Sequence, residues 1–114
     1  MTTSIDVVIP VYNEERGLPH CVTSLRQFLA EALPNPWTIT IADNGSVDRT
    51  LAVAQALAKE YKGVRYIHLD QKGRGRALRR AWLESDHAIL TYMDVDLSTD
   101  LEAFPPLVRA IEDG

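Results

Sequence analysis

The segment Ile5-Asp6-Val7-Val8-Ile9-Pro10-Val11 decides the fold class of this chain, because β-branched residues dominate it and its apolar character is nearly continuous. A run of this kind is typical of a strand that is buried on both faces of a parallel sheet. The same character recurs at 37–42 (WTITIA), 64–69 (VRYIHL) and 87–93 (HAILTYM). We therefore expect these four runs to form strands of one sheet.

Helical periodicity separates the four runs. One helical face is predicted between residues 18 and 29, and the helix should end before the prolines at 34 and 36; the face comprises Leu18, Cys21, Val22, Leu25, Phe28 and Leu29. The segment 51–61 repeats this spacing, with Ser46 or Asp48 available as N-cap and Gly63 as the C′ residue. A third helix is expected from about 76, and a fourth from 101 to about 112 with two prolines in its first turn.

The order β-α-β-α-β-α-β-α predicts an α/β fold of the Rossmann-like type, with three α/β/α layers and a mainly parallel sheet. In open sheets of this class, ligands bind at the carboxyl ends of the strands. Polar residues follow every expected strand, at 10–15 (PVYNEE), 43–46 (DNGS), 70–75 (DQKGRG) and 94–96 (DVD). Because parallel strands end at the same edge of a sheet, these loops are expected to meet there.

Bulk composition narrows the classes of function. The chain has 114 residues, room for one domain, and its 46% hydrophobic and 25% charged residues are ordinary for a globular protein. A net charge of −4 argues against non-specific nucleic-acid binding, which depends on basic side chains. Cys21 is the single cysteine and the N-terminus lacks a secretory signal pattern, so we expect a cytoplasmic location.

Asp94 and Asp96 stand two residues apart directly after the last apolar run. In a strand such residues project to the same side, while Val95 points away. Two carboxylates held together need a compensating cation or proton. Oxygen ligands suit Mg²⁺ or Mn²⁺, which proteins often hold with one or two carboxylates plus substrate phosphates. The alternative is a solvated turn ahead of a helix that residues 98–100 cap.

Asp43 and the segment after the first strand are the next candidates. Asp43 stands at the exit of the second strand, where a carboxylate can accept a hydrogen bond from a nucleotide base; the Asn44-Gly45 dipeptide beside it is typical of a turn. Tyr12 could stack on a base, and Glu14 could bind a ribose or a base. Acidic residues just ahead of a helix are also favoured by its dipole, and this local explanation covers Glu15 well.

The basic cluster at 71–80 (QKGRGRALRR) is the third candidate. Lys72 and Arg74 supply charge, and the adjacent glycines allow close approach of the backbone to an anion. The cluster matches neither a P-loop nor a dinucleotide fingerprint. Arginines 76, 79 and 80 share a helical face that is expected to meet solvent or an acidic or membrane surface. The histidines show no metal-ligand spacing and are expected to be ordinary core-edge or surface residues: His20, His68 and His87.

Four motifs, in this order and spacing, resemble the N-terminal half of family 2 glycosyltransferases: VVIPVYNEE (7–15), IADNGSVDRT (41–50), KGRGRALRRAW (72–82) and YMDVDLSTDL (92–101). Within that family, the chain is most similar to the dolichyl-phosphate and polyprenyl-phosphate mannosyl- and glucosyltransferases. The resemblance covers essentially the whole chain. It implies a GT-A fold that holds a nucleotide-sugar together with a divalent metal ion, Mg²⁺ or Mn²⁺.

The resemblance also implies a role for each candidate residue, by its position in these motifs. The nucleotide would be bound by Pro10, Tyr12, Glu14, Ile41, Asp43, Asp94 and Val95, of which Ile41 and Asp43 would line the base pocket. Asp94 and Asp96 would be the metal ligands and the catalytic pair, with Asp96 the firmer ligand. Lys72 and Arg74 would lie near the diphosphate. Ser98 is a departure, since polyprenyl-phosphate members often carry Gln at this position.

The activity that the resemblance implies is metal-dependent transfer of a sugar, with inversion, from GDP-mannose or UDP-glucose to polyprenyl or dolichyl phosphate. Residues 1–114 would be the nucleotide-sugar-binding part of the catalytic domain, and the acceptor side would lie beyond Gly114. The full-length protein would work at the cytosolic face of a membrane. The alternatives are a soluble member of the family with a hydroxyl acceptor, a nucleotidyltransferase, and a receiver-like signalling module phosphorylated on Asp70. The sequence leaves the oligomeric state open.

Overall fold

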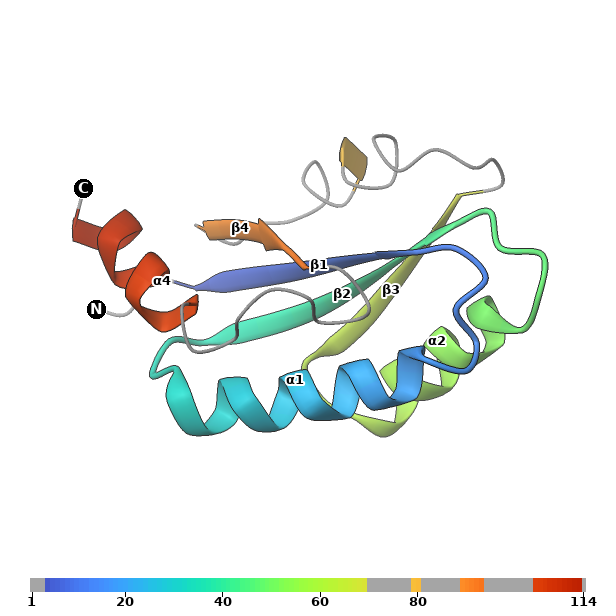
Figure 1. The fold of residues 1–114 in the computed structure, drawn as a ribbon, viewed down its shortest axis with the longest axis horizontal. Coiled ribbons are helices and arrows are strands. Elements are labelled where there is room, and N and C mark those ends of the chain that lie inside the picture. Colours follow the sequence, from blue (N-terminus) through green and yellow to red (C-terminus); the bar gives the residue numbers. More distant parts are fainter. Residues whose placement is uncertain (1–3, 70–78, 81–88, 94–103, 114) are drawn as a thin grey trace.

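The structure, a computed structural model, describes residues 4–69, 79–80, 89–93 and 104–113. Within these ranges lie a parallel sheet and helices that pack on it (Figure 1). In chain order the elements are β1 (Ile5–Val11), α1 (Leu18–Ala32), β2 (Trp37–Asn44), α2 (Thr50–Glu60), β3 (Val64–Leu69), β4 (Ile89–Tyr92) and α4 (Phe104–Asp113). The expected α/β class with a parallel sheet is confirmed.

The sheet has the strand order β3-β2-β1-β4, and every pairing is parallel. β1 is central: Ile5 pairs with Trp37 of β2 on one side and with Ile89 of β4 on the other. At the far end, Val11 pairs with Asp43, and Asp43 pairs with His68 of β3. The carboxyl ends of β1, β2 and β3 therefore lie at one edge, as the sequence predicted.

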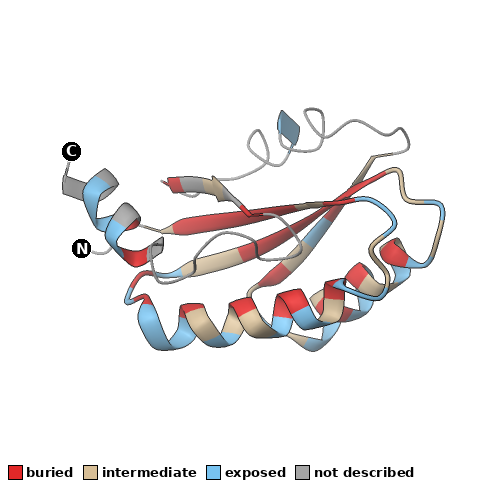
Figure 2. Cartoon of the chain, in the orientation of Figure 1, coloured by how far each residue is buried: buried red, intermediate tan, exposed pale blue. Residues whose placement is uncertain are grey.

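The main core lies between the sheet and helices α1 and α2, which cover the same face (Figure 1). Figure 2 shows the buried residues on the strands and on the helix sides turned toward them. Alternate residues of β1 and β2 enter this core and meet the apolar face of α1; the fully buried members include Ile5, Val7, Ile9, Ile39, Ile41, Leu18, Leu25 and Leu29. Burial of each such side chain contributes about 1.5–3 kcal/mol relative to exposure.

The other face of the sheet carries a smaller apolar cluster of Val8, Ala42 and Ile67 beside a row of buried polar groups. Thr40 Oγ1 donates to Asp6 Oδ1 at 2.7 Å and accepts from Arg65 Nε at 2.9 Å. This row explains how an aspartate is accommodated in an otherwise apolar strand: a hydroxyl in the next strand offsets part of its desolvation. Asp6 Oδ2 remains buried without a hydrogen-bond partner among the described residues.

The ends of several elements differ from the expectation. β2 runs on to Asn44, so Asp43 belongs to the strand rather than to the turn after it. The N-cap of α2 is Arg49, with no side-chain cap, and therefore neither Ser46 nor Asp48. Its C-cap is Tyr61, which places Gly63 beyond the C′ position. The prediction for the third helix is tested only at residues 79–80, which are helical; its remainder lies outside the described residues.

Gly63 is nevertheless required by the turn between α2 and β3. Its φ of +89° lies in the left-handed region, and a Cβ at this position would stand 3.4 Å from Cζ3 of Trp37. Gly63→Ala should therefore lower the free energy of unfolding by about 1–2 kcal/mol, measured by chemical denaturation. Gly17→Ala is the matched control, because φ is −85° there and alanine adopts it without strain. Equal destabilisation by both changes would contradict this explanation.

Candidate functional site

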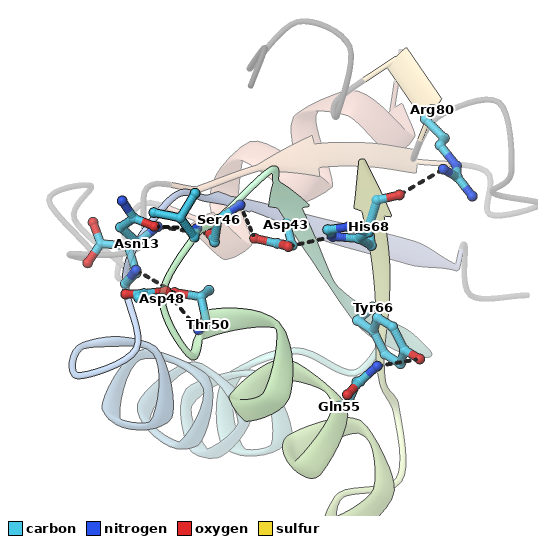
Figure 3. Close-up of polar contacts among 11 residues, drawn as sticks. Asn13, Asp43, Ser46, Asp48, Thr50, Gln55, Tyr66, His68 and Arg80 are labelled. Carbon is cyan, nitrogen blue, oxygen red and sulfur yellow. Dashed lines mark hydrogen bonds and ion pairs between the residues drawn. The ribbon is translucent and has the colours of Figure 1, made fainter. Parts of the chain in front are cut away.

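The carboxyl edge of the sheet gathers polar side chains from three strands and from the loops that follow them. Figure 3 shows a row of contacts that runs from Asn13 through Ser46 and Asp43 to His68 and Arg80. These residues are far apart in the sequence and come together because β1, β2 and β3 all end at this edge. The opposite edge of the sheet, where the strands begin, carries α4 (Figure 1).

Asp43 is the centre of this row. Its side chain has no exposed area, yet both oxygens are hydrogen-bonded: Oδ1 accepts from the backbone N–H of Ser46 at 3.3 Å, and Oδ2 lies 2.6 Å from Nδ1 of His68. The His68 side chain is 32% exposed. A buried carboxylate is tolerated when such partners replace its water. Asp43 is thus held in one orientation from two sides.

The loop after β1 and the loop after β2 are clamped together by reciprocal hydrogen bonds. The backbone N–H of Asn13 donates to Ser46 Oγ at 2.9 Å, and the backbone N–H of Val47 donates to Asn13 Oδ1 at 2.9 Å. Asn13 has a φ of +52°, a left-handed conformation that asparagine adopts more readily than most residues. The clamp fixes the position of both loops relative to Asp43.

Thr50, the first residue of α2, forms a second clamp. Its fully buried hydroxyl accepts from the backbone N–H of Glu14 at 2.7 Å and donates to Asp48 Oδ1. The backbone N–H of Thr50 also donates to Asp48 Oδ1, at 2.8 Å. The carbonyl of Glu14 in turn accepts from the N–H of Leu18, where α1 begins. The backbone of Glu14 is therefore fixed from both sides.

These contacts change the ionisation of Asp48. Desolvation acts to raise the pKa of its carboxyl group, but the hydrogen bonds from Thr50 and from the backbone of Glu15 outweigh it, so the pKa is lowered from its ordinary value of 3.8. The ionised form of Asp48 is thus the form that the second clamp favours.

The predicted nucleotide-binding residues divide into three groups. Tyr12, Glu14 and Asp43 lie at the carboxyl edge; Tyr12 is 36% exposed, and Glu14 is half-buried. Pro10 is half-buried near the end of β1, whereas Ile41 is fully buried in the core under α1 and α2. The remaining predicted residues lie outside the described part of the chain: Lys72, Arg74, Asp94, Val95 and Asp96.

Sequence reasoning missed two contributors to this edge. The sequence predicts an ordinary core-edge or surface histidine at position 68, but His68 pairs with Asp43. The signal in the sequence is that His68 stands near the end of an apolar strand, and the register of the sheet sets it opposite Asp43. Thr50 is the last residue of the motif IADNGSVDRT (41–50), and its contact with the backbone of Glu14 was not predicted. Arg80, expected on a helical face toward solvent or a surface, is exposed but also donates to the carbonyl of His68 at 2.8 Å.

Neither a metal-binding group nor a membrane-spanning helix is found among the described residues. No group of three or more His, Cys, Asp or Glu side chains in that part of the chain could hold a metal ion. Within the same ranges, no helix combines the length and the apolar character that crossing a membrane requires.

The fold has close counterparts among solved structures. A mannosyltransferase from Pyrobaculum calidifontis, solved in complex with GDP-Man and Mn²⁺, superimposes with a TM-score of 0.76 over 98% of this chain and 32% of its own length, at 18% identity. The Staphylococcus aureus protein TarS, in complex with UDP-GlcNAc, gives a TM-score of 0.67 over 99% of this chain. The architecture is therefore that of the GT-A glycosyltransferases.

Sequence comparison agrees with the fold. The chain belongs to the family described as glycosyl transferase family 2, which it matches over residues 6–114. Glycosyltransferase AglD of Haloferax volcanii is 35% identical over 112 residues, which are 96% of this chain and 18% of that protein. The dolichol-phosphate mannosyltransferase of Pyrococcus furiosus is 30% identical over 110 residues, and the dolichyl-phosphate beta-glucosyltransferase of Saccharomyces cerevisiae 31% over 113. The chain spans 30% and 34% of those two proteins.

The second clamp predicts a matched pair of variants. Thr50→Val removes the hydroxyl and leaves the partly buried N–H of Glu14 without its acceptor, so the free energy of unfolding should fall by about 1–3 kcal/mol. Thr50→Ser keeps the hydroxyl and should recover most of this loss. Chemical denaturation of the three proteins measures the difference, and equal stabilities for the Val and Ser variants would contradict the clamp.

The lowered pKa of Asp48 predicts a pH dependence. A carboxyl group whose pKa is depressed by folding stabilises the fold above its unfolded pKa, and this contribution is lost as pH falls through the folded pKa. Thermal unfolding between about pH 5 and pH 2 should therefore show a smaller loss of stability for Asp48→Asn than for the wild type. Asn retains an acceptor for the N–H of Thr50. Parallel acid profiles would show that Asp48 does not contribute.

Proposed function

We propose that this chain is the nucleotide-sugar-binding part of an inverting glycosyltransferase that transfers a sugar from GDP-mannose or UDP-glucose to polyprenyl or dolichyl phosphate. The observation that carries the proposal is Asp43: a buried carboxylate with an oriented plane, at the carboxyl edge of a GT-A sheet, between two clamped loops. Ligands of open α/β sheets bind at this edge. Membership of family 2 supports the transfer reaction.

The names of the relatives support the choice of donor and acceptor. Two of them are a dolichol-phosphate mannosyltransferase and a dolichyl-phosphate beta-glucosyltransferase, and one neighbour in fold was solved with GDP-Man and Mn²⁺. A phosphate monoester has its second pKa at about 6, so a polyprenyl or dolichyl phosphate acceptor is largely ionised at neutral pH. It attacks without a strong general base, which makes binding and orientation of the donor the main task of this part of the protein.

In this proposal Asp43 accepts an N–H of the nucleotide base. A carboxylate offers about four lone-pair sites, of which Ser46 and His68 each use one. Because Asp43 has no exposed area, the base reaches it by displacing a covering group, and this lowers the affinity. Tyr12, which is exposed on the clamped loop, stacks on the base, and Glu14 binds the ribose. Pro10 and Ile41 support these contacts from β1 and β2.

The metal ion is assigned to Asp94 and Asp96. The backbone N–H of Met93, the residue before Asp94 in the sequence, donates to the carbonyl of Val8 in β1 at 3.0 Å. The donor set is all oxygen, which fits Mg²⁺ or Mn²⁺. A divalent ion held by these two carboxylates would supply positive charge to the departing diphosphate. Lys72 and Arg74 are assigned to the diphosphate by their place in the basic cluster.

Isothermal titration calorimetry with GDP and with UDP, each in the presence of Mn²⁺, tests this proposal. The chain should bind at least one of the two nucleotides, and Asp96→Asn should weaken Mn²⁺-dependent binding at least about tenfold, because a charged ligand is lost. Asp70→Asn is the control, since it removes an acid that follows β3 and has no assigned role here. Absence of heat with both nucleotides at millimolar concentration would contradict the proposal, as would unchanged binding by Asp96→Asn.

A further inference from the structure

His68 has no role in the activity proposed above, yet it makes the shorter of the two contacts that hold the Asp43 carboxylate. Its Nδ1 lies 2.6 Å from Oδ2 of Asp43, a short hydrogen bond of the kind that an ionised partner strengthens. A carboxylate oxygen only accepts, so this ring nitrogen carries the hydrogen. The carboxylate is fully buried and the ring is 32% exposed. His68 is thus the member of the pair that lies nearer to solvent (Figure 3).

The pair is built into the sheet rather than formed by a loop. Asp43 and His68 are register partners of the parallel strands β2 and β3, so the pairing fixes both side chains on the same side of the sheet. The carbonyl of His68 accepts a hydrogen bond from Nη1 of Arg80 at 2.8 Å. The ring is therefore presented to Asp43 from a strand position whose backbone is held on two sides.

The hydrogen bond from His68 to Asp43 matters because an aspartate carboxylate rotates easily about its last side-chain torsion, whose preferences are broad. The Ser46 N–H holds Oδ1 at 3.3 Å, which is long for a hydrogen bond and fixes the plane only weakly. The contact from His68 at 2.6 Å fixes Oδ2 and hence the plane. The plane determines where the remaining lone pairs point, and therefore where a donor group of a base can bind.

We propose that His68 is a positioning residue of the nucleotide site: it orients Asp43 so that the carboxylate accepts the N–H of the base, and thereby sets the preference among bases. This inference rests on the proposed role of Asp43 as the acceptor. It adds His68, a residue within β3, to the set of residues assigned to the site above.

Three substitutions of His68 separate the ways in which it could act. Asn places an amide N–H close to the position of Nδ1, Gln places one close to the position of Nε2, and Leu offers neither. Calorimetry with Mn²⁺ and with GDP or UDP, whichever the wild type binds more tightly, gives Kd for each variant. The same titration with the nucleotide methylated at base N1 (GDP) or N3 (UDP) reports the contribution of the base N–H. Tyr66→Phe is the control, since Tyr66 lies on β3 two residues before His68 and contacts Gln55.

The expected result is that His68→Leu raises Kd about tenfold and narrows the preference for the unmethylated base, because Oδ2 of Asp43 loses its donor. His68→Asn should restore both properties, and Tyr66→Phe should change neither. Wild-type behaviour of His68→Leu would overturn the inference. Restoration by Gln instead of Asn would also overturn it, as would equal weakening for both forms of the nucleotide, the result of a purely structural role.

Asp43→Leu, which removes both acceptor oxygens, distinguishes failure of this inference from failure of the function on which it rests. If Asp43→Leu keeps the affinity of the wild type and its preference for the unmethylated base, Asp43 is not the base acceptor and both proposals fail. If Asp43→Leu loses the preference for the unmethylated base while the His68 variants keep it, the nucleotide site stands and only the role of His68 is wrong.

Discussion

The parallel pairing of β1 with β2, from Ile5 opposite Trp37 to Val11 opposite Asp43, is the constraint on which the rest of the structure depends. It buries alternate residues of both strands under α1 and α2, and it brings the ends of the two strands to the same edge. The loops that follow are then close enough for Asn13, Ser46 and Val47 to bond reciprocally. Since β3 continues the pairing, His68 arrives beside Asp43 without any contribution from a loop.

Polar groups are buried on both faces of this sheet, and the two sets have different consequences. Asp6, Thr40 and Arg65 share hydrogen bonds on the face away from α1 and α2, near the middle of the strands, where they stabilise the pairing of β1, β2 and β3. Asp43 and His68 pair at the carboxyl edge, next to the loops. Only the second set lies where open α/β sheets bind ligands, and only this set enters the function that we propose for this member of glycosyl transferase family 2.

The sequence predicted the elements well because their patterns are local. The bounds of β1 and β3 follow from their apolar runs, and the helix over Leu18–Ala32 follows from its periodicity. Asp43 was a candidate because it follows the apolar run 37–42, which predicts a strand. The partners of Asp43 and Glu14 were not found, since His68 and Thr50 are 25 and 36 residues away from them and the contacts depend on strand register and loop closure. Caps were misassigned at α2, where Asp48 bonds to Thr50 without occupying the N-cap position.

We propose that the carboxyl edge around Asp43 receives the nucleotide. Paramagnetic broadening of amide NMR signals by Mn²⁺ in the presence of GDP or UDP tests this most directly, because broadening falls off steeply with distance from the ion. The amides of Asn13, Ser46 and Val47 should broaden or shift on addition of the Mn²⁺–nucleotide complex, while those of Ile5 and Trp37, where the strands begin, should remain unchanged. Broadening centred on the beginning of the strands, or an unchanged spectrum at saturating nucleotide, would contradict it.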